Sequence, residues 1–130
     1  MKKLLFLLLV SLFMVGCSND DDQSNSLNLI GTWDWVRSSG GITGETTTPE
    51  STGTSMTLEI TNTTITRIVD NDLIISENAY SIQVRETMSG EFREMLIVGD
   101  GIGQIITIEG NSLILTGDCN DCVTSEYVKQ

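Results

Sequence analysis

Histidine is absent from the sequence, and the 130 residues include only one proline and three cysteines. Without histidine the chain has neither the usual general base of enzymes nor the commonest ligand of zinc. No serine–lysine motif takes its place, so no serine or threonine stands in a pattern that would activate it as a nucleophile. The composition therefore indicates a protein that is not an enzyme, and it points to no cofactor and no metal.

Positive charge is also scarce. Seven lysine and arginine residues stand against 18 acidic residues, and Lys2 and Lys3 precede all of the acidic ones. A chain this acidic repels nucleic acid and anionic lipid headgroups. The charge balance argues against a nucleic-acid partner and is compatible with a cation or a neutral molecule.

One long apolar run is present, over residues 4–15. It has the length of a signal-peptide core and is too short to span comfortably, as a helix, a hydrocarbon layer of roughly 30 Å. Met14-Val15-Gly16-Cys17 then resembles the lipobox of bacterial lipoproteins, which implies cleavage before Cys17 and acylation of its thiol. We expect a signal peptide over residues 1–16 and a lipid bilayer as the partner of acylated Cys17, because two or three acyl chains anchor stably.

Cys17 is followed at once by Ser18-Asn19-Asp20-Asp21-Asp22. A serine in this place resembles an outer-membrane sorting signal, and the acidic cluster resembles the surface-export signal of lipoproteins from Bacteroidetes. The alternative is a periplasm-facing domain on a solvated tether. The expected plan is a tether over residues 17–26 and one domain over residues 27–130.

After the tether, β-branched runs alternate with turn residues, and no stretch has the 3.6-residue period of a helix. Met56, Leu58 and Ile60, for example, alternate with polar side chains, as in a half-buried strand. Eight strands are expected, over residues 29–38, 56–60, 63–69, 73–85, 92–98, 104–109, 112–116 and 123–129. A closed antiparallel meander has no free edges, so the sequence predicts an all-β, eight-stranded up-and-down barrel, with a β-sandwich as the alternative.

Several motifs in this region resemble those of a known family. Gly31-Thr32-Trp33 resembles the Gly-x-Trp motif of lipocalins, in which the tryptophan packs on a basic residue of the last strand; here that residue would be Lys129. A Gly/Ser/Thr-rich first loop, a late Cys-x-x-Cys and a final "EYV" make residues 29–129 similar to the small lipocalin-like lipoproteins of Bacteroidetes. The resemblance implies a barrel and a membrane-anchored location, and it implies no ligand.

Candidate ligand-binding residues lie in the first strand and the segment after it. Trp33 and Trp35 share one face of the strand, where they either pack in the core or form an aromatic platform at the barrel mouth. Residues 39–54, which read SGGITGETTTPESTGT, form a long connection of the kind that is usually functional or disordered, and Ile42 is its one large apolar side chain. We expect a mostly packed interior, with any binding surface at the mouth beside residues 40–53.

Cys119-Asn120-Asp121-Cys122 places two cysteines across a tight turn. Outside the cytoplasm such a pair more often forms a disulfide than binds a metal, and no second ligand pair for zinc is available. Free thiols and a redox or metal site are the alternatives. We expect a structural disulfide between Cys119 and Cys122.

Together these features predict a membrane-anchored, lipocalin-like binding module for a small molecule or a glycan. The alternative is an envelope or cell-surface interaction scaffold, or a hydrolase inhibitor, in which the barrel is filled and its loops contact a protein partner that the sequence does not identify.

Overall fold

The computed structural model describes residues 28–130, so the expected signal peptide, Cys17 and the tether lie outside the described residues. In this part of the chain no helix is long and apolar enough to cross a membrane. The elements, in chain order, are β1 (Gly31–Gly40), β2 (Thr46–Thr47), α2 (Pro49–Thr52), β3 (Met56–Ile60), β4 (Thr64–Val69), β5 (Leu73–Glu86), β6 (Phe92–Val98), β7 (Gln104–Glu109), β8 (Ser112–Gly117) and β9 (Val123–Lys129).

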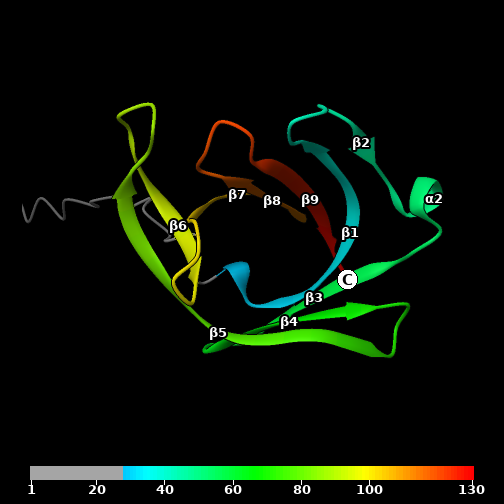
Figure 1. Cartoon of the computed structure of the whole chain (residues 1–130). Helices are drawn as coiled ribbons and strands as arrows, with labels where there is room; N and C mark the ends of the chain where they lie inside the picture. The colour runs from blue at the N-terminus through cyan, green and yellow to red at the C-terminus, as the bar shows by residue number, and fades with distance from the viewer. Residues whose placement is uncertain (1–27) are drawn as a thin grey trace, which may run out of the picture.

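The strands form one antiparallel sheet that closes on itself (Figure 1). Each strand from β3 to β8 pairs with the next in the chain, β1 pairs with β3, and seven residue pairs between β1 and β9 complete the ring. The predicted eight-stranded barrel is confirmed, with small shifts at the strand ends, and the sandwich alternative is wrong because the two edges are joined. β2 is an additional short strand beside β1.

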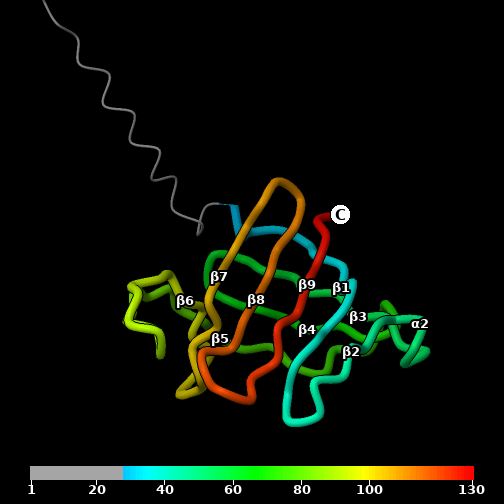
Figure 2. The backbone as a smooth tube through the Cα atoms, turned by 90° about the horizontal axis from the view of Figure 1, so that it is seen from above, coloured from blue at the N-terminus to red at the C-terminus, as the bar shows by residue number. Residues whose placement is uncertain are grey.

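The up-and-down order gives the barrel two different ends. At one end β1 begins and β9 finishes; we call it the terminal end, and Gly31 and Lys129 mark it. At the other end β1 finishes and β4, β6 and β8 turn into the strands that follow them; we call it the loop end. Figure 2 shows the C-terminus on one side and the loop after β1, with the β8–β9 turn, on the other.

The segment between β1 and β3 is structured. Ser38 and Ser39 of β1 pair with Thr47 and Thr46 of β2. α2 then begins with a capping box, in which the Thr48 hydroxyl accepts from the Ser51 amide at 3.2 Å and the Ser51 hydroxyl accepts from the Thr48 amide at 2.8 Å. These bonds satisfy backbone donors that a helix start otherwise leaves open, which explains why a single helical turn is stable here.

The core fills the terminal end and the middle of the barrel. Every bulky residue that alternation predicts to point inward does so: Trp33, Leu58, Ile60 and Leu115 are buried, and Met56, Tyr80 and Ile82 pack against them. Trp35 shares the inward face of Trp33 and lies opposite Tyr127, and the register shift that follows, between Trp35 and Arg37, leaves Val36 exposed and without a partner on β9. The weakest part of the ring is the β6–β7 seam, which has two residue pairs, Met95 with Ile105 and Leu96 with Gln104.

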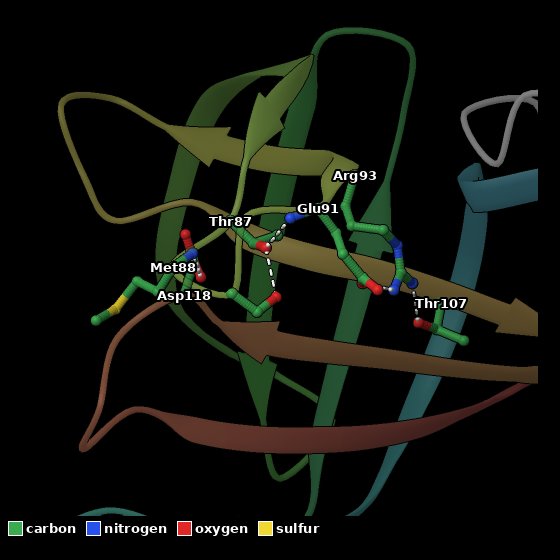
Figure 3. Close-up of polar contacts among 7 residues, drawn as sticks. Thr87, Met88, Glu91, Arg93, Thr107 and Asp118 are labelled. Carbon is green, nitrogen blue, oxygen red and sulfur yellow. Dashed lines mark hydrogen bonds and ion pairs between the residues drawn. The ribbon is translucent and has the colours of Figure 1, made fainter.

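The β5–β6 hairpin extends beyond the barrel and is held at its tip (Figure 3). The Met88 amide donates to Asp118 Oδ1 in the β8–β9 turn at 3.1 Å, and Arg93 of β6 donates to the Thr107 hydroxyl of β7 at 3.4 Å. Within the hairpin, the Thr87 hydroxyl accepts from the Glu91 amide at 3.2 Å. These contacts fix the hairpin against strands with which it forms few backbone pairs.

Candidate functional site

A cavity of about 160 Å³ lies inside the barrel near the loop end. Its wall crosses five strands, from β3 to β7, and includes the places where β6 finishes and β7 begins. Three of the lining side chains are apolar and four are polar or charged: Leu58, Ile65 and Val98, with Arg67, Ser76, Asn78 and Gln104. Leu58 and Ile65 are buried whereas Asn78 is exposed, so the cavity has an apolar floor and opens beside Asn78.

The strand register explains why an arginine points into the barrel. Residues directly opposite one another in an antiparallel pair lie on the same face of the sheet. Arg67 lies opposite Leu58, which is fully buried in the core, and opposite Ser76 on its other side. Arg67 is thus on the inward face, and it supplies the only charge among the seven lining residues. Its Nε atom is buried and has no hydrogen-bond partner.

Beside the cavity, a chain of polar side chains connects β1, β9 and Arg67. Trp35 Nε1 donates to Ser38 Oγ at 2.8 Å, and the hydroxyl oxygens of Ser38 and Ser125 are 2.7 Å apart. Burial raises the pKa of the Tyr127 hydroxyl, while the charge of Arg67 and hydrogen bonds with Ser125 and Arg67 lower it in part. The phenol therefore stays protonated at physiological pH and keeps its capacity to donate a hydrogen bond.

A second hollow, of about 170 Å³, lies against the segment after β1. Its lining is rich in hydroxyl groups and holds no aromatic ring: Ser38, Ser39, Gly40, Thr43, Glu45, Thr47 and Val123. Ser38 also belongs to the polar chain that leads through Ser125 and Tyr127 to Arg67, so hydrogen bonds connect the second hollow with the cavity. This lining suits hydrogen bonding to a polar molecule.

The three candidate ligand-binding residues do not come together. Trp33 is 0% exposed at the terminal end, where its Nε1 donates to the Leu29 carbonyl at 2.8 Å, so it packs in the core. Trp35 is buried against the interior, one hydrogen bond away from the second hollow. Ile42 is 90% exposed and lines neither hollow. Trp35 could therefore affect a binding site at the loop end only through its hydrogen bond to Ser38, which lines the second hollow.

The Cys119–Cys122 disulfide is present in the β8–β9 turn. Two glycines make room for it. A Cβ atom at Gly117 would lie 2.6 Å from Cys122 Cβ, and one at Gly40, whose φ is +109°, would lie 2.8 Å from the Cys122 carbonyl oxygen. The disulfide turn is thus packed directly between the ends of β1 and β8 at the loop end.

The cavity residues Arg67, Ser76, Asn78 and Gln104 were not among the candidates from the sequence. A signal for Arg67 existed: it shares the alternation of Ile65, so a strand with Ile65 inward also directs Arg67 inward. Ser76 and Asn78 likewise share the face of the inward Tyr80. Gln104 gave no comparable signal, because its position depends on the closure of the ring at the β6–β7 seam.

Within residues 28–130 no group of three or more cysteine, aspartate or glutamate side chains is arranged to hold a metal ion. The cavity offers one positive charge and several hydrogen-bonding groups over an apolar floor, a combination of groups that small-molecule sites commonly have. Comparison of the chain with protein-family models, curated proteins and solved structures finds no match.

Proposed function

We propose that the protein is a non-enzymatic binding module that takes a small molecule at the loop end of its barrel. The observation that carries this proposal is the cavity, because four polar side chains converge over an apolar floor inside a barrel whose core is otherwise apolar. A merely structural barrel would bury apolar side chains here, since polar groups that lack partners cost stability.

The proposed module is anchored to the membrane through acylated Cys17 and faces outward from the outer membrane; a periplasm-facing position is the alternative. The lipobox and the acidic segment after Cys17 support this location. The Cys17→Ser variant should remain unprocessed and free of acyl chains, because the thiol is the acceptor. Labelled palmitate that still enters this variant would contradict the anchor.

A native mass spectrum of the protein purified from its own host tests the binding function. A retained small molecule supports it, and two variants then locate the ligand. Asn78→Ala alters the cavity, whereas Thr43→Val removes a hydroxyl from the second hollow at nearly constant size. Loss of the ligand in the first variant alone assigns it to the cavity, and loss in the second alone assigns a polar ligand such as a glycan to the loop.

A protein-interaction scaffold is the second candidate, and the β5–β6 hairpin favours it. Val84, Met88 and Phe92 are exposed on this hairpin, and Phe92 is 69% exposed. Exposed apolar side chains on one projection are typical of contact surfaces. A photo-crosslinker at Phe92 should then capture one partner in intact cells, while the same group at exposed Glu109 should not. Equal labelling from both positions would contradict a contact through the hairpin.

A further inference from the structure

The interior arginine identifies the chemistry of the ligand. Arginine is always charged in proteins, so an arginine inside a barrel carries the full cost of burying a charge unless a partner compensates for it. The Nε of Arg67 is shielded from solvent and unpaired, although a buried donor without a partner is costly. The other residues that line the cavity include no carboxylate that would neutralise it. We infer that the cavity binds the carboxylate of a small organic acid, with Arg67 as its ionic partner.

The guanidinium group suits a carboxylate in geometry as well as in charge. Nε–H and one Nη–H of arginine point in parallel and can donate to both oxygens of a carboxylate at once. Ser76, Asn78 and Gln104, on the same wall, provide hydroxyl and amide donors for the oxygen lone pairs that remain. Such a ligand would give the buried Nε the acceptor that it lacks in the free protein.

The size and the lining of the cavity narrow the class of ligand further. A volume of 160 Å³ is well below the range of about 300–1,000 Å³ that drug-sized ligands occupy. Leu58, Ile65 and Val98 would contact a hydrocarbon part rather than a second charged group. The net charge of −11 also disfavours a divalent anion more than a monovalent one. A short monocarboxylate, or the carboxylate end of a larger molecule, fits these constraints better than inorganic phosphate.

Apolar side chains near the opening suggest where a longer tail would lie. Leu73 is exposed at the start of β5, three residues before Ser76, and Ile102 is exposed two residues before Gln104. A hydrocarbon tail that leaves the cavity on this side would meet apolar surface rather than water. This inference rests on the proposed function, because it names the ligand class for the same cavity.

The test uses the full-length, nitrogen-15-labelled protein in a non-ionic detergent. Of the four arginines, only Arg67 has a buried Nε without a partner, so its side-chain Nε–H signal reports directly on the cavity; Arg67→Lys assigns the signal by removing it. Acetate, butyrate and octanoate are titrated against acetamide, butyramide and octanamide, which match them in size but lack the charge. Inorganic phosphate and glucose form two further arms.

Butyrate should shift the Arg67 Nε–H signal, and butyramide should bind at least about tenfold more weakly, because a hydrogen bond to a charged group contributes about that factor. Arg67→Met should lose butyrate binding by a similar factor. Arg85→Lys is the matched control: Arg85 is exposed and hydrogen-bonds to Gln83 on its own strand. If the affinity rises from acetate to octanoate, the natural ligand has a hydrocarbon tail that contacts the apolar side chains near the opening. If the three affinities are equal, the natural ligand is a short acid.

Several outcomes would overturn the inference. Butyramide that binds as tightly as butyrate, phosphate that binds more tightly than butyrate, or an Arg67→Met variant that binds butyrate as tightly as the unchanged protein would each contradict a carboxylate site. If glucose shifts the cavity signals while no carboxylate does at millimolar concentration, the carboxylate class is wrong and the binding function stands. If no probe shifts them and native protein carries no ligand, the proposed function fails as well.

Discussion

The ammonium group of Lys129 lies over the ring of Trp33, with Nζ 5.1 Å from the ring centroid. This contact joins the first and last strands at the terminal end, as the lipocalin-like pattern leads one to expect. Gly31 completes the arrangement: a Cβ atom there would lie 2.8 Å from Lys129 Cε, and its φ of +144° is one that other residues rarely adopt. At the terminal end, the Lys129 side chain thus packs on the indole ring of Trp33 and against Gly31.

Replacing Lys129 should test the contribution of its charge to this closure. Lys129→Met keeps the aliphatic stem over the indole but removes the charge, so it should lower the free energy of unfolding by about 1 kcal/mol. Urea unfolding, followed by tryptophan fluorescence, measures the loss. Lys129→Arg is the control and should retain most of the stability. Equal stability of all three proteins would show that the cation contributes nothing here.

Most of the fold could be predicted because strand alternation is a local property. The alternation of Leu58 and Ile60 with polar residues identifies the inward face of their strand without reference to the rest of the chain. The same alternation rule correctly predicts seven bulky inward positions. β2 and α2 were missed for different reasons. β2 exists only as a partner of β1, which no local pattern shows, whereas Thr48 and Pro49 are a readable helix start that the Gly/Ser/Thr-rich composition masked.

The candidate site was harder to predict, because it depends on which faces meet across the barrel. The two tryptophans were conspicuous by residue type, yet Trp33 belongs to the closed end. Arg67 and Gln104 lie far apart in the sequence and face one cavity only because β3 to β7 curve around it. The sequence alone could show that an arginine occupies an inward position. That this arginine faces a cavity follows only from the closure of the barrel.

Ionisation of the two tyrosines provides a prediction for alkaline pH. Burial raises the pKa values of both Tyr80 and Tyr127 above the ordinary value of about 10. Each tyrosine therefore holds its proton more tightly in the folded chain, so its contribution to stability is complete below pH of about 10 and is lost as pH rises through the folded pKa. Unfolding free energies measured across this range should fall with pH, and less steeply in Tyr127→Phe.

Arg67 should influence the same titration. Its charge and hydrogen bonding lower the pKa of Tyr127, so Arg67→Met should raise that pKa further. Ultraviolet absorbance of the phenolate measures the change, and Tyr127→Phe identifies which transition belongs to Tyr127. A Tyr127 transition that does not move in Arg67→Met would place the guanidinium away from the phenol.

The disulfide should have a modest effect on stability. It closes a very short loop, so its contribution should lie near the low end of the ~0–5 kcal/mol range of disulfides. Cys119→Ser should fold, with a slightly lower melting temperature. Gly117→Ala should cost more, because its new Cβ would lie 2.6 Å from Cys122 Cβ. Complete loss of folding in Cys119→Ser, or one equivalent of zinc bound to the reduced protein, would contradict a structural disulfide.

The last prediction concerns the bond that holds the β5–β6 hairpin to the barrel. Asp118 Oδ1 accepts from the Met88 amide, so Asp118→Ala removes this acceptor whereas Asp118→Asn keeps an oxygen in its place. Hydrogen exchange of the Met88 amide should become about tenfold faster in Asp118→Ala, because a bond to a charged acceptor contributes roughly that factor. The Thr87 amide donates to the Glu91 carbonyl within the hairpin at 2.7 Å and should exchange as before.

The pair of amides separates release of the hairpin from its unfolding. Faster exchange at Met88 alone means that the tip has left the β8–β9 turn while the hairpin remains paired. Faster exchange at both Met88 and Thr87 means that Asp118 maintains the hairpin itself, and no change at either means that the bond does not restrain the tip. Only the first result leaves Phe92 on an intact hairpin whose position Asp118 controls. In that case Asp118→Ala should also alter crosslinking from Phe92, if the hairpin contacts a partner.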